Sequence, residues 1–130
     1  MTGFETASLA SARQVTAPDG SDVRILPELA GGSMAHFTLA SGVTSRAVSH
    51  RTVEEIWFVV SGRGEMWRAS ADREEIVVLE PDRALTIPRG TRFQFRADAS
   101  GPLSIVGVTM PPWPGDDEAV AVDGPWEPTA

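Results

Sequence analysis

The chain contains no cysteine, lysine, asparagine or tyrosine, and three of these absences exclude a class of chemistry. Without cysteine, disulfide bonds, thiolate catalysis and cysteine-bound zinc are excluded. Without lysine and tyrosine, Schiff-base and phenol mechanisms are excluded as well. There is also no run of 18 consecutive apolar residues, and the first residues show no charged region followed by a long apolar stretch. We therefore expect a cytoplasmic protein that does not associate with membranes.

Positive charge is scarce. The 18 acidic residues outnumber the 11 basic ones, all arginine, and the net charge is −7. No basic cluster offsets this excess, so the surface is expected to repel nucleic acid and anionic lipid. The length of 130 residues suits one domain with a single core.

Short strand patterns follow one another along the chain, and no stretch of helical length shows a 3.6-residue period. Turn residues separate these patterns at intervals of about 8 to 12 residues, which is typical of an all-β sandwich or barrel. The expected strands are 23–26, 34–39, 56–60, 65–68, 75–79, 84–87, 93–96 and 103–110.

We divide the chain into a flexible N-terminal arm (1–17), a β-barrel (18–110) and a C-terminal tail (111–130). Prolines around Trp113 prevent the tail from forming a central strand. Trp113 and Trp126 are expected to pin the tail onto the barrel or onto a partner subunit. A lid over the barrel mouth is the alternative.

The segment 42–62 places titratable residues directly before an apolar run. His50 is followed by Glu54 and Glu55, and these carboxylates directly precede the apolar run 56–60. The run is short, rich in β-branched and aromatic residues and closed by Ser-Gly, which predicts a strand buried on both faces. Titratable groups are therefore expected at the mouth of a hydrophobic β core.

The spacing in this segment resembles the first motif of the cupin superfamily, and a second segment resembles the second motif. The fixed places of the two motifs are taken by Gly42, Val48, His50, Glu55 and Gly62, and by Asp82, Pro88, Gly90, Phe93 and Ala97. Family members commonly hold a divalent metal with three His and one Glu, of which only His50 and Glu55 are present here. Val48 and Phe93 replace the other two imidazoles. The resemblance implies a single-domain double-stranded β-helix, or jelly-roll barrel, with a degenerate metal motif.

Strand alternation predicts which side chains share the barrel interior with His50. The predicted pocket is apolar and aromatic with few polar groups, as small-molecule sites are. Arg46 would hold a carboxylate or phosphate of the ligand. The substrate-binding candidates are Arg46, Val48, Trp57, Phe93 and Phe95.

Several functions remain open for His50 and Glu55. In the favoured hypothesis the pair needs no cofactor and exchanges protons with a small apolar or aromatic substrate, as an isomerase, lyase or cyclase does. The first alternative is a metal-dependent oxygenase or isomerase, with Fe, Mn, Ni or Zn held by His50 and Glu55 and, if it faces the pocket, by His36. His36 reaches the pocket only if its apolar strand neighbours face outward, so a partly exposed His36 is favoured. The second alternative is a non-catalytic small-molecule-binding protein.

Strand 56–60 also bears on assembly. Its outward face would carry Ile56, Phe58 and Val60, which form too apolar a surface to be left in water. We expect the second sheet or a second subunit to cover it, and we predict a homodimer.

Overall fold

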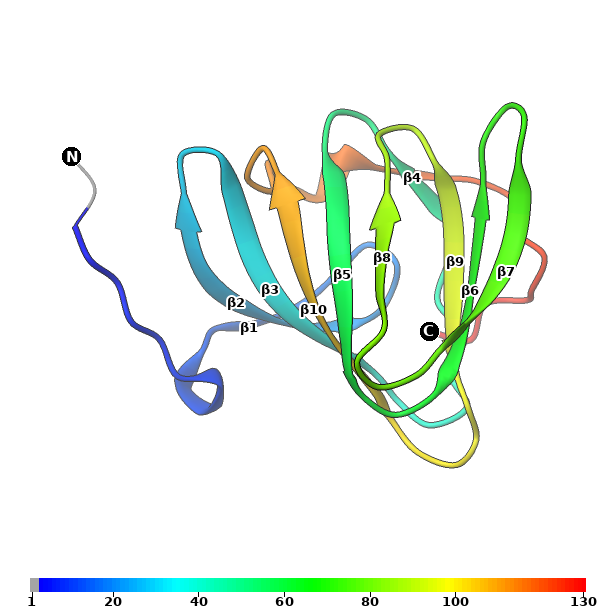
Figure 1. The fold of residues 1–130 in the computed structure, drawn as a ribbon, viewed down its shortest axis with the longest axis horizontal. Coiled ribbons are helices and arrows are strands. Elements are labelled where there is room, and N and C mark those ends of the chain that lie inside the picture. The colour runs from blue at the N-terminus through cyan, green and yellow to red at the C-terminus, as the bar shows by residue number, and fades with distance from the viewer. Residues whose placement is uncertain (1–2) are drawn as a thin grey trace.

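The computed structural model describes residues 3–130, which form two antiparallel β-sheets (Figure 1). The order of strands is β1-β2-β3-β10-β5-β8 in the first sheet and β11-β4-β9-β6-β7 in the second. Two short 3-10 helices, η1 (Leu9–Ser11) and η2 (Asp116–Glu118), lie near the chain ends. The strands are β1 (Gln14–Thr16), β2 (Asp22–Leu29), β3 (Gly32–Leu39), β4 (Val48–His50), β5 (Glu54–Ser61), β6 (Gly64–Ala69), β7 (Glu74–Leu79), β8 (Ala84–Ile87), β9 (Arg92–Ala97), β10 (Leu103–Met110) and β11 (Ala119–Ala121).

This architecture confirms the all-β jelly-roll fold. Every strand expected from the alternation pattern is present, and the expected ranges 84–87 and 103–110 agree with β8 and β10 to the residue. The strands that the pattern missed, β1, β4 and β11, are three residues long. Alternation cannot be recognised in so short a run.

The boundary of the N-terminal arm needs correction. Residues 14–16 lay within the expected arm, but they pair with β2 as the edge strand of the first sheet, with Val15 opposite Val23. The Gln14 side chain also donates a hydrogen bond to Asp22, at 2.6 Å. In Figure 1 only the chain before β1 extends away from the sheets.

Aromatic rings form the centre of the core between the two sheets. The ring of Trp57 contacts Phe37 and Phe95 edge to face, with centroids 4.7 Å and 5.0 Å away. Gly107 on the central strand β10 leaves room for them, because a Cβ there would lie 2.8 Å from Phe37 and 3.1 Å from Trp57. Glycine is thus required where the two rings approach the backbone.

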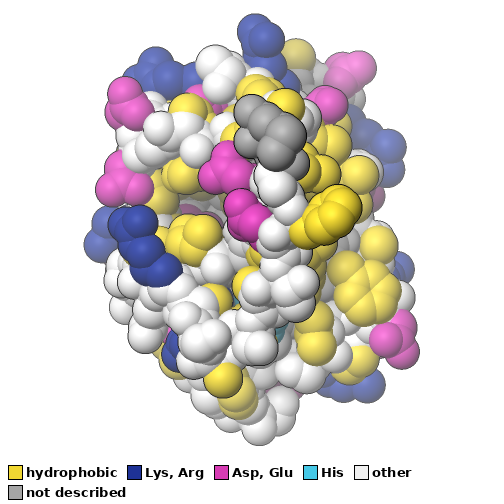
Figure 2. All heavy atoms as spheres, turned by 90° about the vertical axis from the view of Figure 1, so that its left-hand side faces the viewer, with side chains coloured by type: hydrophobic (Ala, Val, Ile, Leu, Met, Phe, Trp, Pro, Cys, Tyr) yellow, Lys and Arg dark blue, Asp and Glu magenta, His cyan; other side chains and the backbone are white. Residues whose placement is uncertain are grey.

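Strand β5 alternates between core and surface. Trp57 and Val59 are buried, whereas Ile56, Phe58 and Val60 are 47%, 44% and 45% exposed. The expected burial on both faces is wrong for the single chain, because within residues 3–130 nothing covers the outer side of β5. Hydrophobic side chains are also exposed among charged ones on the face shown in Figure 2.

The C-terminal tail packs against the outside of the second sheet. The amide of Gln94, fully buried on β9, donates to the carbonyl of Trp126 at 2.8 Å and accepts from its backbone N–H at 3.1 Å. The Arg96 guanidinium lies 4.1 Å from the centroid of the Trp126 ring. These contacts hold the end of the tail on the barrel wall.

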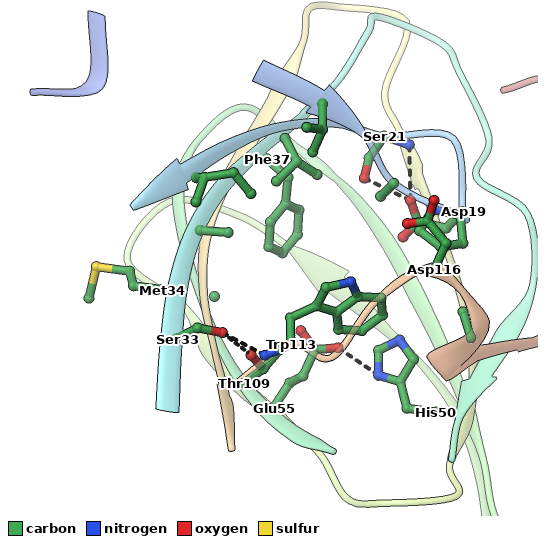
Figure 3. A pocket seen from close by; sticks show the side chains of 18 of the residues that line it. Asp19, Ser21, Ser33, Met34, Phe37, His50, Glu55, Thr109, Trp113 and Asp116 are labelled. Atoms are coloured by element: carbon green, nitrogen blue, oxygen red, sulfur yellow. Dashed lines mark hydrogen bonds and ion pairs between the residues drawn. The ribbon is translucent and has the colours of Figure 1, made fainter. Parts of the chain in front are cut away.

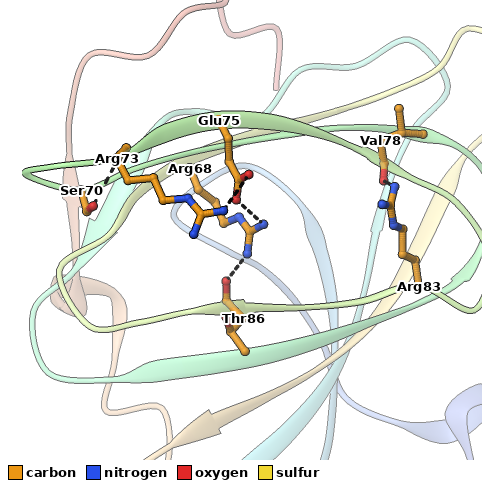
Figure 4. Close-up of polar contacts among 7 residues, drawn as sticks. All are labelled: Arg68, Ser70, Arg73, Glu75, Val78, Arg83 and Thr86. Carbon is orange, nitrogen blue, oxygen red and sulfur yellow. Dashed lines mark hydrogen bonds and ion pairs between the residues drawn. The ribbon is translucent and has the colours of Figure 1, made fainter.

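Arg68 connects the two sheets at their edge strands, β7 and β8. It leaves β6, donates to the backbone carbonyl of Thr86 on β8 at 2.7 Å, and pairs with Glu75 on β7 at 3.0 Å (Figure 4). Arg73 pairs with the other oxygen of Glu75 at 3.2 Å. The arginines here are therefore paired with acidic neighbours.

None of the helices within residues 3–130 has the length and apolar character needed to cross a bilayer.

Candidate active site

A cavity of about 190 Å³ opens between the sheets, and most of its wall is apolar. Residues from strands of both sheets line it, together with the β1–β2 turn and the tail. Figure 3 shows the labelled side chains that point into it. Its polar and charged lining residues include Asp19, Ser21, Ser33, His50, Glu55, Thr109 and Asp116.

His50 and Glu55 form a buried pair on the cavity wall (Figure 3). Nδ1 of His50 lies 3.0 Å from Oε2 of Glu55, and both residues are 7% exposed. The ring N–H is not aligned with this oxygen, so the contact is electrostatic rather than a well-formed hydrogen bond. The indole N–H of Trp57 donates to Oε1 of Glu55 at 3.2 Å. Both carboxylate oxygens are therefore occupied by fixed neighbours.

Aromatic rings hold the imidazole in place. The His50 ring meets Phe93 edge to face with centroids 5.2 Å apart, and meets Trp113 in the same way at 5.1 Å. The backbone N–H of Trp113 donates to the hydroxyl of Ser33, which is also hydrogen-bonded to Thr109. The start of the tail thus forms one wall of the cavity.

Glu118 in η2 sets the geometry of the loop that joins His50 to Glu55. Its carboxylate accepts hydrogen bonds from the backbone N–H groups of Thr52 and Val53, at 2.6 Å and 2.9 Å, and from the Thr52 hydroxyl at 2.7 Å. Burial raises the pKa of Glu118, but these hydrogen bonds, with a smaller contribution from His50, outweigh it, and the pKa is lowered overall. Sequence reasoning missed this residue, because nothing near it in the chain indicates a partner 66 residues away.

Asp19 is a second residue that sequence reasoning missed. In the sequence it stands before Gly20, a pair that indicates only a turn, yet Asp19 lines the cavity. Burial raises its pKa, hydrogen bonds from Ser21 oppose this, the charge of Glu55 raises it further and His50 lowers it. The net shift is upward. An Asp-Gly turn carries no local signal that it will fold over a cavity.

Three of the expected substrate-binding residues, Val48, Trp57 and Phe93, line the cavity. Phe95 instead lies in the core behind Trp57 and is fully buried. Arg46 is exposed, and its guanidinium lies 3.5 Å from the carbonyl of Pro18. The inward orientation expected for Arg46 is wrong because β4 begins only at Val48, and the irregular residues before it do not continue the alternation.

His36 does not reach the cavity. It is half-buried on β3 with Arg24 of β2 as its register partner, while its neighbours Ala35 and Phe37 line the cavity. Desolvation and the charge of Arg24 lower the pKa of its imidazole, and Asp22 partly opposes this. In the part of the chain that the structure describes, no three His, Asp or Glu side chains are arranged to hold a metal ion. The residues present therefore do not fit the four-ligand cupin metal site, and we derive no step through a metal.

The structure is therefore a small jelly-roll barrel with a buried His–Glu pair on the wall of a largely apolar cavity. Residues 35–109 match the family model described as a cupin domain, and the chain belongs to the cupin family. This confirms the resemblance read from the two motifs. No curated protein matches the chain.

Several solved structures are similar in fold. A variant of Streptomyces Pac13 with uridine is 18% identical at a TM-score of 0.72, covering 94% of this chain and 92% of that one. Pac13 is described as a unique nucleoside dehydratase. Bacillus subtilis oxalate decarboxylase OxdC is 13% identical at a TM-score of 0.75, covering 93% of this chain and 34% of that one. The Schizosaccharomyces pombe Cnp3 cupin domain is 11% identical at a TM-score of 0.67, covering 82% and 73%. At these identities the likeness shows the fold alone.

Proposed function

We propose that this cupin binds a small, largely apolar or aromatic molecule in its cavity and transfers protons on it through His50 and Glu55, without a metal. The observation that carries the proposal is the buried His50–Glu55 pair, 3.0 Å apart on the wall of a cavity lined by aromatic rings. Such a placed acid/base pair contributes about 10² to 10⁴ in rate.

The roles of the two residues follow from their contact. The carboxylate of Glu55 next to Nδ1 favours the tautomer of His50 that carries its proton on Nδ1. The lone pair then lies on Nε2, on the side of the ring away from Glu55 (Figure 3). Nε2 is the base, and Glu55 stabilises the imidazolium that forms when it accepts a proton.

Elimination of water is the reaction type that we place first. The support is the similarity to Pac13, a nucleoside dehydratase crystallised with uridine. The rings of Trp57, Phe93 and Trp113 line the cavity here, and they offer apolar surface to a planar ring. A β-hydroxy carbonyl compound, either free or as part of an oxidised nucleoside sugar, is therefore the first class of substrate to test.

The test is a panel of β-hydroxy carbonyl compounds and nucleosides, assayed with wild type, His50→Gln and Glu55→Gln. Glu54→Gln is the matched control, since Glu54 is the adjacent, exposed carboxylate. We expect turnover by wild type and Glu54→Gln, and a loss of about 10²-fold or more in the other two. Equal turnover by all four proteins overturns the roles of His50 and Glu55. Uridine binding without turnover of any compound favours the non-catalytic alternative.

Treatment with a chelator tests whether the activity needs a metal. Protein purified without a histidine tag is assayed after EDTA treatment and subjected to elemental analysis. Unchanged activity supports the proposal. Activity that is lost and then restored by Fe, Mn, Ni or Zn favours the metal-dependent alternative.

We further propose that the protein is a homodimer in which a second copy covers the outer face of β5. Ile56 and Phe58 are exposed there, and they lie opposite Val108 and Val106 of β10. In sedimentation at micromolar concentration, Phe58→Glu is expected to shift a dimeric wild type towards monomer. Ile76→Glu, at an equally exposed site on β7 of the other sheet, is expected to leave the mass unchanged. A monomeric wild type contradicts the proposal.

A further inference from the structure

The β1–β2 turn brings a third titratable side chain into the cavity, and the roles proposed above do not use it. Oδ1 of Asp19 accepts hydrogen bonds from the backbone N–H of Ser21 at 2.9 Å and from the Ser21 hydroxyl at 2.7 Å. Ser21 is 2% exposed. Since both hydrogen bonds end on Oδ1, Oδ2 is the oxygen that remains for a molecule bound in the cavity.

The turn is held firmly on the barrel, so the position of this carboxyl group is set before any ligand binds. Ala17 donates to the carbonyl of Ser21, and Gly20 donates to the carbonyl of Ala17, both at 2.9 Å. The backbone N–H of Arg46 donates to the carbonyl of Asp19 at 2.9 Å. A preset donor of this kind costs little reorganisation during a reaction.

Asp19 and the His50–Glu55 pair reach the cavity from different elements. His50 comes from β4 and Glu55 from β5, whereas Asp19 lies in the turn beside Ser21 (Figure 3). The charged groups that face Asp19 are Glu55, His50 and Asp116 of η2.

Burial and the charge of Glu55 both raise the pKa of Asp19, and together they prevail over the opposing influence of Ser21 and His50. Burial and the nearby charge of Glu55 therefore both favour the protonated form of Asp19, which is the form that an acid needs.

We propose that Asp19 is the catalytic proton donor of this site and protonates the leaving oxygen of a β-hydroxy carbonyl substrate while His50 removes the proton from carbon. This inference rests on the proposed function. It adds the acid that an elimination needs, because hydroxide is a poor leaving group unless it departs as water.

The step balances with the residues present. Nε2 of His50 takes the proton from the carbon next to the carbonyl, and that C–H electron pair forms the carbon–carbon double bond. The C–O bond breaks, its electrons leave with oxygen, and the oxygen takes the proton of Asp19 and departs as water. His50 ends protonated and Asp19 ionised. One proton passed through solvent from His50 to Asp19 restores both.

The first measurement needs no substrate. Protein labelled with ¹³C at aspartate carboxyl groups is titrated by NMR, and the Asp19 signal is assigned from its loss in Asp19→Asn. We expect Asp19 to titrate above the ordinary aspartate value of 3.8, and at lower pH in Glu55→Gln than in wild type. The exposed-site control Glu54→Gln is expected to leave it unchanged. An ordinary midpoint, or one that Glu55→Gln does not move, overturns the inference.

The second measurement uses a compound that wild type dehydrates. Asp19→Asn keeps an oxygen acceptor for Ser21, and it is expected to lower kcat by about 10²-fold or more and to abolish the alkaline limb of the pH profile. An analogue whose leaving group needs no proton is expected to restore the rate, which a merely structural role would not do.

Failure of the role of Asp19 can be distinguished from failure of the proposed function. Turnover that depends on His50 and Glu55 but is unaffected in Asp19→Asn, or is lost equally with both substrates, overturns this inference alone. Absence of turnover by wild type overturns the proposed function and this inference together.

Discussion

Replacing Glu118 with glutamine is expected to destabilise the protein, because its carboxylate fastens the loop between His50 and Glu55. Three hydrogen bonds from Thr52 and Val53 end on its two oxygens, at 2.6–2.9 Å, and Glu118 is 4% exposed. Glutamine has nearly the same shape. Its one oxygen can still accept from the two backbone N–H groups, but its N–H₂ group replaces the second oxygen, so the Thr52 hydroxyl must accept where it donated, and the negative charge is lost.

The magnitude follows from the loss of the charge. A hydrogen bond to a charged group contributes about 1.5–3 kcal/mol, whereas one between neutral groups contributes about 0.5–1.5 kcal/mol. Weakening each of the three bonds by about 1 kcal/mol therefore lowers the free energy of unfolding by about 3 kcal/mol. A domain of this size is stable by about 5–15 kcal/mol, so Glu118→Gln is expected to fold. Its melting temperature is expected to fall by about 10 °C.

The assay is urea unfolding of wild type and Glu118→Gln across a range of pH. The folded state lowers the pKa of Glu118 below its ordinary value of 4.5. The stability that the carboxylate contributes is therefore fully present above that value and is lost as the pH falls through the lower, folded-state pKa. The difference between the two proteins is expected to be largest at neutral pH and to shrink as the pH falls below 4.5.

Asp117→Asn is the matched control, because Asp117 is exposed one residue earlier and uses only its backbone carbonyl to accept from Arg51. Its effect is expected to stay within about 0.5 kcal/mol. A Glu118→Gln variant as stable as wild type, or a stability difference that does not change with pH, would refute the reasoning.

Further variants test the cavity wall. Gly107→Ala would place a methyl group 2.8 Å from Phe37 and 3.1 Å from Trp57, so urea unfolding should show a loss of about 1–3 kcal/mol; wild-type stability would mean that the two rings can move aside. Trp113→Ala removes one aromatic ring from the cavity wall, and a contact of that ring with a planar ligand would contribute about 0.5–1.5 kcal/mol, so calorimetry should show up to about tenfold weaker uridine binding. Unchanged affinity would place the ligand away from the tail. Arg46→Ala should leave uridine affinity unchanged, since Arg46 is exposed outside the cavity; a marked loss would contradict that placement.

The jelly-roll fold could be predicted because its signals are local. Alternation within a strand and the turn residues between strands lie within a few positions of one another, and all of the longer strands were found from them. Gly62 and Gly90, at fixed places of the two motifs, also indicated turns. Both adopt positive φ, at 86° and 81°, which glycine permits. Alternation predicts that Val48 and Trp57 face the interior, the second motif adds Phe93, and all three line the cavity.

The failures come from places where alternation does not hold or is not enough. Arg46 lies in irregular chain before β4, so alternation counted back from His50 predicts an inward orientation that the structure does not have. Phe95 does point inward, but Trp57 lies between it and the cavity. The distance of an inward side chain from the cavity depends on the size of side chains contributed by other strands. The sequence of one strand does not contain that information.

By itself, the sequence determined the strand pattern, the barrel class and the delivery of His50 and Glu55 to an apolar interior, because these depend on residues close together in the chain. Only the tertiary structure decided that Asp19, Trp113 and Glu118 belong to the same site. Each of them is brought there by closure of the barrel and by the return of the tail, through contacts such as the one between Thr52 and Glu118, 66 positions apart. Contacts at that separation depend on the whole fold, so no short stretch of sequence can specify them.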